Sequence, residues 1–172
     1  REDDRLYFTM DYIDGKSARQ RVEDEGAFPP REAAALRADI ASALEFVHKA
    51  GVLHRDVKPH NVLIDRAGRG YLSDFGLAKA SEGQSGLTLS GAALGTPSYM
   101  APEIAARGAK EASPASDVYS LGATLYEMLT GKPPFTGLSG IDLIRAVAET
   151  EAPSPRVVRP DLHPDLEVIC QK

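Results

Sequence analysis

The stretch that decides the fold of this chain is His54-Arg55-Asp56-Val57-Lys58-Pro59-His60-Asn61, and Asp74-Phe75-Gly76 follows it. Phosphoryl transfer from a nucleotide to a hydroxyl needs a carboxylate that accepts the hydroxyl proton, a cation on the moving group and oxygen ligands for magnesium. Asp56 offers the carboxylate and Lys58 the cation, whereas Asn61 and Asp74 offer the metal ligands. The sequence therefore predicts a phosphoryl-transfer site that uses ATP and Mg²⁺.

A third motif, Ala101-Pro102-Glu103, lies farther along the chain. The motifs H-R-D-x-x-x-x-N, D-F-G and A-P-E, in this order, are typical of protein kinases, and the whole chain resembles the C-terminal lobe of such an enzyme. Kinases of sugars and antibiotics are the alternative, because they share a loop with a catalytic Asp and a later Asn. Residues 95–103 favour a protein kinase, since they resemble the shelf on which protein kinases bind an extended peptide.

Lys58 followed by Pro59 resembles the serine/threonine branch of protein kinases, in particular the bacterial group that is similar to eukaryotic kinases. The resemblance implies transfer of the γ-phosphoryl group of ATP to Ser or Thr hydroxyls of protein substrates. Asp56 would then be the base, and Lys58 would steady the transferred group. The hydroxyl of Thr96 would bridge Asp56 and Lys58.

Composition narrows the class of protein. The 172 residues carry a net charge of −5 without a basic cluster, and 42% of them are hydrophobic. One ordinary core is therefore expected, and nucleic acid is not an expected partner. Cys170 is the single cysteine, and no apolar run is long enough to span a membrane. We expect a cytoplasmic kinase domain that is an interior piece of a longer protein, whose membrane attachment the sequence leaves open.

Residues 6–12 place large apolar side chains at every second position, which predicts a strand with one buried face. By resemblance, this strand is the last one of the N-terminal lobe and runs into the hinge of the nucleotide site. The residues expected at the nucleotide are Met10 behind the adenine, Asp11, Tyr12 and Ile13 along its edge, Asp14 at the ribose and Leu63 beneath the adenine. Strand packing or a turn position is the alternative for each of them.

The resemblance implies an α+β, protein-kinase-like fold, with a mostly helical C-terminal lobe that contains short β-hairpins. Residues 1–14 would hold the last strand of the N-terminal lobe and the hinge, whereas residues 15–172 would form the truncated C-terminal lobe. The N-terminal lobe would be largely missing. Residues 68–70 separate two short apolar runs, so we interpret their glycines as a hairpin turn rather than a phosphate-binding loop.

Helical spacing predicts a helix that opens at Pro29-Pro30 and closes near Gly51. A second helix is expected from Asp117 to Gly131, and shorter ones near residues 141–147 and from residue 166 onward. The residues expected on the buried faces of the second and third helices are Val118, Leu121, Leu125, Met128, Leu129, Ile141, Ile144 and Val147.

Four residues are expected to have structural roles. By resemblance, Asp117 holds the backbone of residues 54–55, and Phe75 packs beside His54. We expect His48 to be a residue favoured by the dipole at a helix C-terminus rather than a catalytic group. Glu103 is expected to lack a partner, because the arginine that pairs with it in kinases would lie beyond this chain; burial would then cost about 3–5 kcal/mol.

Residues 77–94 are rich in Gly, Ser and Ala, as expected of an activation loop. Thr88 and Ser90 lie where related bacterial kinases carry autophosphorylated residues, which allows for a kinase homodimer. Arg55 is the expected cation for such a phosphate. We expect phosphorylation of Thr88 or Ser90 to raise activity, and an unchanged rate after both are replaced by Ala would contradict this.

Two non-catalytic alternatives stay open. A complete kinase carries a Gly-rich loop and a strand lysine upstream of the hinge, and neither is found in this sequence. The chain could therefore belong to a pseudokinase or be a truncated interaction module. Because the isolated 172-residue chain lacks the small lobe that would cover the phosphates, we expect it to transfer phosphate negligibly.

Overall fold

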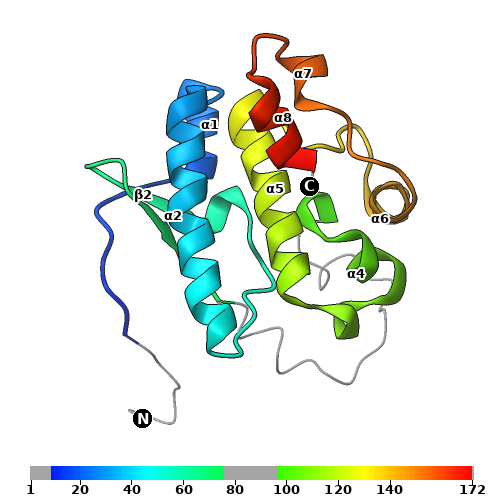
Figure 1. The fold of residues 1–172 in the computed structure, drawn as a ribbon, viewed down its shortest axis with the longest axis horizontal. Helices are drawn as coiled ribbons and strands as arrows, with labels where there is room; N and C mark the ends of the chain where they lie inside the picture. The colour runs from blue at the N-terminus through cyan, green and yellow to red at the C-terminus, as the bar shows by residue number, and fades with distance from the viewer. Residues whose placement is uncertain (1–8, 76–96, 172) are drawn as a thin grey trace.

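The centre of the molecule is a pair of long helices that lie side by side, α2 and α5 (Figure 1). A computed structural model describes residues 9–75 and 97–171. A small sheet and helix α1 lie at one side of this pair, and helices α4 and α6 lie at the other (Figure 1). The chain belongs to the α+β class, as the sequence predicts.

Helix α2 spans Pro30–Lys49 and confirms the prediction for this segment. Pro30 stands at its first position, where a missing N–H costs nothing. Its buried residues are Ala33, Leu36, Ile40 and Leu44, all of them apolar. The helix ends at Lys49, and the loop that carries Asp56 follows it.

The sheet has three antiparallel strands in the order β1 (Gly15–Ser17), β2 (Val62–Asp65) and β3 (Gly70–Leu72). The expected hairpin turn joins β2 to β3, and Gly68 has a φ of +83° there. A Cβ on Gly70 would lie 3.3 Å from Leu36 Cδ2. Glycine at this position therefore lets the hairpin lie against α2.

Helix α5 spans Pro114–Thr130 and begins three residues before the predicted start at Asp117. Ser113 and Ser116 form a capping box that sets this earlier start. Leu121, Leu125, Met128 and Leu129 are buried as predicted. Val118 is 45% exposed, because Asp117 and Leu121 occupy the inward positions of that turn.

The remaining described elements are short. They are α1 (Ala18–Glu25), η1 (Pro59–Asn61), η2 (Pro97–Tyr99), α4 (Pro102–Arg107), η3 (Ala109–Glu111), α6 (Gly140–Glu149), α7 (Pro155–Val158) and α8 (Pro164–Gln171). Helix α6 buries Leu143 and Val147, whereas Ile141 is 64% exposed, so the inner face of α6 differs from the predicted one. Cys170 packs against the core, and burial raises the pKa of its thiol to about 12.

The strand predicted over residues 6–12 does not form in its described part. Residues 9–14 lie outside the described strands, and Met10 and Tyr12 are 61% and 87% exposed. A strand needs a neighbour for its backbone N–H and C=O groups, and no described strand lies alongside this segment. None of the helices in residues 9–75 and 97–171 is long and apolar enough to cross a membrane.

Candidate active site

The loop between α2 and β2 turns sharply at Arg55, whose φ is +66°. Asp74, one of the two predicted metal ligands, has a φ of +57°. Within the described part of the chain, these are the non-glycine residues with positive φ, a conformation that costs about 1–3 kcal/mol and persists only when the surroundings enforce it. Arg55 directly precedes Asp56, the predicted base, and Asp74 is itself a predicted metal ligand. Both strained residues therefore belong to the predicted catalytic site.

Asp117 of α5 holds the first of these turns. Its Oδ2 accepts a hydrogen bond from the backbone N–H of His54, and its Oδ1 accepts one from the N–H of Arg55, both at 2.8 Å. The side chain is buried, with a relative exposure of 3%. These contacts confirm the predicted anchor, and a third donor, Nε2 of His48, lies 2.8 Å from Oδ2.

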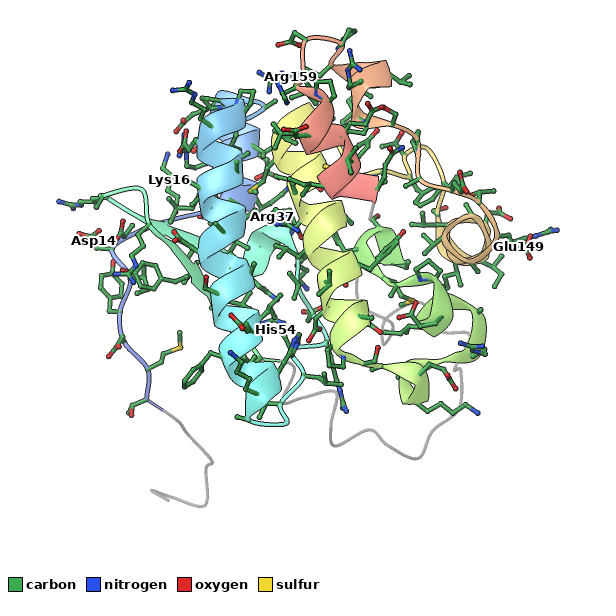
Figure 2. All side chains as sticks on the ribbon, viewed as in Figure 1. Asp14, Lys16, Arg37, His54, Glu149 and Arg159 are labelled. Carbon is green, nitrogen blue, oxygen red and sulfur yellow. The ribbon has the colours of Figure 1, made fainter. Side chains whose placement is uncertain are left out.

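His54 connects this turn to the segment that carries Asp74. Its Nε2 lies 2.9 Å from the carbonyl oxygen of Ser73, so this nitrogen is the donor. Its Nδ1 accepts the N–H of Asp56 at 3.2 Å, which indicates a neutral ring. Burial lowers the pKa of His54 and agrees with that state. The ring of Phe75 lies 4.7 Å away, so His54 is structural, as predicted; Figure 2 shows it between α2 and α5.

Asp56, Lys58 and Asn61 form one hydrogen-bonded group. Lys58 Nζ lies 2.8 Å from Asp56 Oδ2. Asn61 donates its amide N–H₂ to the backbone carbonyl of Asp56 at 2.8 Å and to Asp56 Oδ2 at 3.1 Å. The carboxylate, the cation and the amide predicted to act together are therefore side by side.

The residues present fit a magnesium ion that arrives with a nucleotide. The amide nitrogen of Asn61 faces Asp56, which leaves the amide oxygen for a metal. The hydroxyl of Ser73 lies 3.3 Å from the backbone carbonyl of Asn61 and 3.2 Å from Asp74 Oδ2, and so links the two candidate ligands. The described residues contain no cluster of three or more metal-binding His, Cys, Asp or Glu. Mg²⁺ usually takes one or two protein oxygens and completes its shell with phosphates and water.

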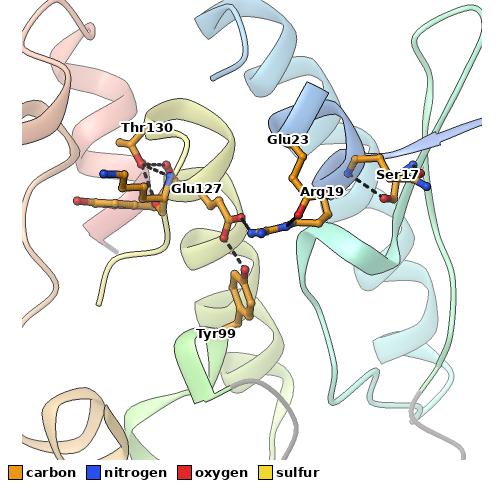
Figure 3. Close-up of polar contacts among 9 residues, drawn as sticks. Ser17, Arg19, Glu23, Tyr99, Glu127 and Thr130 are labelled. Atoms are coloured by element: carbon orange, nitrogen blue, oxygen red, sulfur yellow. Dashed lines mark hydrogen bonds and ion pairs between the residues drawn. The ribbon is translucent and has the colours of Figure 1, made fainter. Parts of the chain in front are cut away.

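A second polar group lies at the other end of α5. Glu127 is fully buried and accepts hydrogen bonds from Arg19 Nη1 at 2.8 Å and from the Tyr99 hydroxyl (Figure 3). Arg19 also donates to Glu23 at 2.7 Å. Burial raises the pKa of Tyr99 far above its ordinary value, and the adjacent carboxylate of Glu127 raises this pKa further. This group joins α1 and α5 to η2, the start of the predicted peptide shelf.

Comparison with known proteins decides the family. The protein kinase domain matches residues 1–163. The chain is a member of the protein kinase family. The chain is 37% identical over 166 residues to the serine/threonine-protein kinase PknB of Mycobacterium leprae, covering 96% of this chain and 26% of that protein. It is 36% identical over 171 residues to the serine/threonine-protein kinase PrkC of Bacillus subtilis, covering 99% of this chain and 26% of that protein.

The chain thus spans about a quarter of the length of the curated relatives that it matches. The chain is also 38% identical over 167 residues to the serine/threonine-protein kinase PknB of Mycobacterium tuberculosis. The predicted family and fold are confirmed. The roles of individual site residues, and the domain boundary at residues 14 and 15, stay predictions.

The structure brings the predicted nucleotide-binding residues only partly together. Leu63 lies on β2, partly buried, and pairs with Ser17 on β1. Tyr12, Ile13 and Asp14 line a cavity of about 350 Å³ together with the turn between β2 and β3. Figure 2 shows Asp14 beside the small sheet, where it pairs with Arg66 at 2.9 Å.

Met10 is exposed at the surface, as is Asp11. The regulatory prediction falls largely on residues that are not described. Thr88, Ser90 and Thr96 lie outside the described residues. Arg55, the predicted cation for a phosphate, is exposed.

The prediction for Glu103 is wrong. Glu103 does not lack a partner, because the hydroxyl of Ser116 donates a hydrogen bond to its carboxylate. Glu103 is also only partly buried, so the predicted penalty for an isolated charge does not arise.

Sequence reasoning missed two contacts, the bond of His48 to Asp117 and the pairing of Arg19 with Glu127. The partners in each pair are far apart along the chain. A local signal existed only for His48, which stands in the last turn before the catalytic loop.

Proposed function

We propose that this chain is the catalytic lobe of an ATP-dependent protein serine/threonine kinase, which transfers the γ-phosphoryl group to Ser or Thr hydroxyls of proteins. The observation that carries the proposal is the hydrogen-bonded group of Asp56, Lys58 and Asn61 on a turn that Asp117 anchors. Membership of the family and the names of the relatives support the same reaction.

In this proposal, Asp56 orients the acceptor hydroxyl and receives its proton as the γ-phosphoryl group leaves ATP. Lys58 lies 2.8 Å from the same carboxylate and places a positive charge beside the transferred group. Asn61 and Asp74 would hold Mg²⁺, which neutralises phosphate charge when bound. The chain contributes positioning and electrostatics rather than a covalent intermediate.

The nucleotide would bind between this lobe and an N-terminal lobe. We assign the adenine edge to Asp11, Tyr12 and Ile13, with Met10 behind the ring. Asp14 would contact the ribose, and Leu63 would lie beneath the adenine. The exposure of Met10 and Tyr12 supports this assignment, because it leaves both side chains uncommitted to the described core.

The residues do not support a preference for arginine near the acceptor. Such a preference needs acidic side chains that face the peptide. Lys16 is basic and pairs with Asp24 at 2.8 Å, and Glu127 is committed to Arg19 and Tyr99. We further propose that the kinase works in the cytoplasm, where ATP is available, and that two copies meet for autophosphorylation.

The test is Asp56→Asn in the complete kinase that contains this chain. Loss of the general base is expected to lower kcat by about 10²–10⁴-fold, while binding of Mg²⁺–ATP stays within a few-fold. Phosphate transfer to a Ser-containing and a Thr-containing protein is the measurement. Asp165→Asn, at a surface carboxylate that is 83% exposed, is the matched control and should leave the rate unchanged.

Near-normal transfer by the Asp56→Asn variant would show that the role assignment is wrong. The pseudokinase alternative predicts that the unaltered complete kinase binds nucleotide without turnover, so the same assay separates the two.

A further inference from the structure

Ser73 is a buried residue that lies between the two groups expected to hold magnesium, Asn61 and Asp74. Its backbone is held on both sides. The N–H of Ser73 donates to the carbonyl oxygen of Asn61 at 2.9 Å, and the carbonyl oxygen of Ser73 lies 2.9 Å from His54 Nε2. Because a serine side chain has one torsion angle with three staggered positions, the fixed backbone leaves the hydroxyl few places to lie.

The hydroxyl of Ser73 has one proton and two acceptors. Its Oγ lies 3.3 Å from the carbonyl oxygen of Asn61 and 3.2 Å from Asp74 Oδ2. Both distances exceed the roughly 2.8 Å of an unshared O–H···O bond, which indicates that the proton is shared. The Asn61 carbonyl also accepts the N–H of Ser73, whereas no other group among the described residues donates to the Asp74 carboxylate.

The orientation of Asp74 depends on this single donor. Asp74 is exposed, and its backbone lies in the left-handed region. An exposed carboxylate rotates unless a neighbour holds it, and a group that must be immobilised on binding lowers the affinity. Mg²⁺ requires a nearly octahedral arrangement of oxygens. A carboxylate that a hydrogen bond already orients is therefore the better ligand, as is general for metal sites in proteins.

We propose that Ser73 is a positioning residue for magnesium: its hydroxyl orients the carboxylate of Asp74 and thereby lowers the Mg²⁺ concentration that the nucleotide site requires. This inference rests on the proposed kinase function for the role of Asp74 as a metal ligand. The orientation of Asp74 by the hydroxyl is a property of the chain itself, and it can be measured without metal or nucleotide.

The surroundings of Ser73 make the proposal testable by substitution. Ser73→Ala removes the hydroxyl but keeps the backbone N–H that the Asn61 carbonyl accepts. The carboxylate of Asp74 is exposed, so water replaces the lost donor. The Ala variant therefore leaves no buried polar group without a partner and should fold with normal stability. Ser73→Thr keeps a hydroxyl on the same carbon atom and is the conservative variant.

The experiment compares Ser73→Ala with Ser73→Thr in the complete kinase. Isothermal titration calorimetry measures the affinity for ADP over a range of Mg²⁺ concentrations. In the Ala variant, the Mg²⁺ concentration that gives half of the gain in ADP affinity should rise about tenfold, because the metal ligand loses its orienting bond. Binding of ADP without Mg²⁺ should be unchanged. The Thr variant should match the unaltered kinase in both measurements.

The rate of phosphate transfer is the second readout. The Ala variant should need about tenfold more Mg²⁺ for half of its maximal rate, whereas kcat at saturating Mg²⁺ should stay within about twofold. A residue with only a structural role would lower kcat or stability and would leave the dependence on Mg²⁺ unchanged.

Ser42→Ala is the matched control, because Ser42 is exposed on α2 and its hydroxyl donates to the carbonyl oxygen of Ala38 at 2.9 Å. This variant also loses one hydroxyl, and its dependence on Mg²⁺ should be normal. An unchanged dependence on Mg²⁺ in Ser73→Ala would overturn the proposal. A Thr variant that is as stable as the unaltered kinase but shifted as far as Ser73→Ala would overturn it too.

NMR couplings that report the χ1 angle of Asp74, measured without metal or nucleotide, are the third readout. We expect one rotamer in the unaltered kinase and in Ser73→Thr, and averaged couplings in Ser73→Ala. If the unaltered complete kinase binds Mg²⁺ and ADP but transfers no phosphate, the proposed function fails, and the couplings and the calorimetry still decide the role of Ser73. Equal couplings in the unaltered kinase and Ser73→Ala would overturn that role.

Discussion

Two buried carboxylates on α5 are satisfied in different ways. Asp117, near the start of the helix, accepts two backbone N–H groups of the catalytic loop and one side-chain donor, His48. Glu127, near the end, accepts only side-chain donors in the described residues, Arg19 and Tyr99. Both carboxylates are within 2% of complete burial.

This difference predicts which properties of the protein a substitution at each end of α5 will change. Backbone N–H groups are present whatever side chains the loop carries. Asp117 therefore holds the conformation of the loop backbone and does not depend on which side chains stand at residues 54 and 55. The donors to Glu127 depend on two particular residues, and its contacts reach the shelf through Tyr99. We therefore expect changes at Asp117 to affect catalysis and folding together, and changes at Glu127 to affect mainly stability and peptide binding.

The largest effect is expected from Asp117→Ala. The substitution leaves the buried N–H of His54 and the partly buried N–H of Arg55 without an acceptor, which costs about 1–3 kcal/mol for the buried group and less for the other. The free energy of unfolding should fall by about 1–5 kcal/mol, and kcat should fall at least about 100-fold because Asp56 is displaced. Urea unfolding and phosphate transfer by the complete kinase are the measurements.

Asp142→Ala is the matched control, since Asp142 also stands in the first turn of a helix but is exposed. It should change stability by less than about 0.5 kcal/mol. An Asp117→Ala protein as stable and active as this control would contradict the anchoring role.

An intermediate effect is expected from Glu127→Gln. The amide keeps an acceptor for Tyr99 but loses the charge that pairs with Arg19. Because Arg19 is about one-third exposed (33%), solvent screens part of the loss, and the free energy of unfolding should fall by about 1–3 kcal/mol. The KM for the peptide should rise more than kcat falls.

A double-mutant cycle with Arg19→Met isolates the pair, and we expect a coupling energy of about 1–3 kcal/mol. The same cycle on Arg145 and Glu149, an exposed ion pair on α6 at 3.0 Å, should give no more than about 0.5 kcal/mol. Equal coupling energies in the two cycles would mean that the burial of Glu127 does not strengthen its interaction with Arg19.

The smallest effect concerns pH and His54, which links the two strained segments. Burial lowers the pKa of His54 in the folded protein below its ordinary value of 6.5. Below about pH 6.5, the unfolded chain therefore binds a proton that the folded chain does not. Stability should fall as the pH drops from 6.5 through the folded pKa, by at most about 1.4 kcal/mol per pH unit for one proton.

Urea unfolding between pH 7.5 and 5.5 measures this slope. His54→Phe should flatten it, whereas His163→Phe, at an exposed histidine, should not. Identical slopes for all three proteins would exclude His54 as the titrating group.

The sequence alone determined the family, the course of α2, the hairpin and the group of Asp56, Lys58 and Asn61. These features depend on residues that are close together in the chain, where apolar spacing, turn glycines and fixed motifs act locally. The anchor at Asp117 and the contact of Phe75 with His54 were predicted only through the resemblance to kinases, and the structure confirms both.

Only the tertiary structure decided which distant side chains meet. The bond of His48 to Asp117, the group around Glu127 and the partner of Glu103 depend on how α2, α4 and α5 pack. A helical pattern defines an apolar face only as a broad stripe. The pattern therefore placed Val118 on the buried face of α5, whereas the structure leaves it 45% exposed. The strand expected over residues 6–12 depended likewise on a neighbouring strand, because backbone pairing and burial are properties of the assembled layers and not of the segment itself.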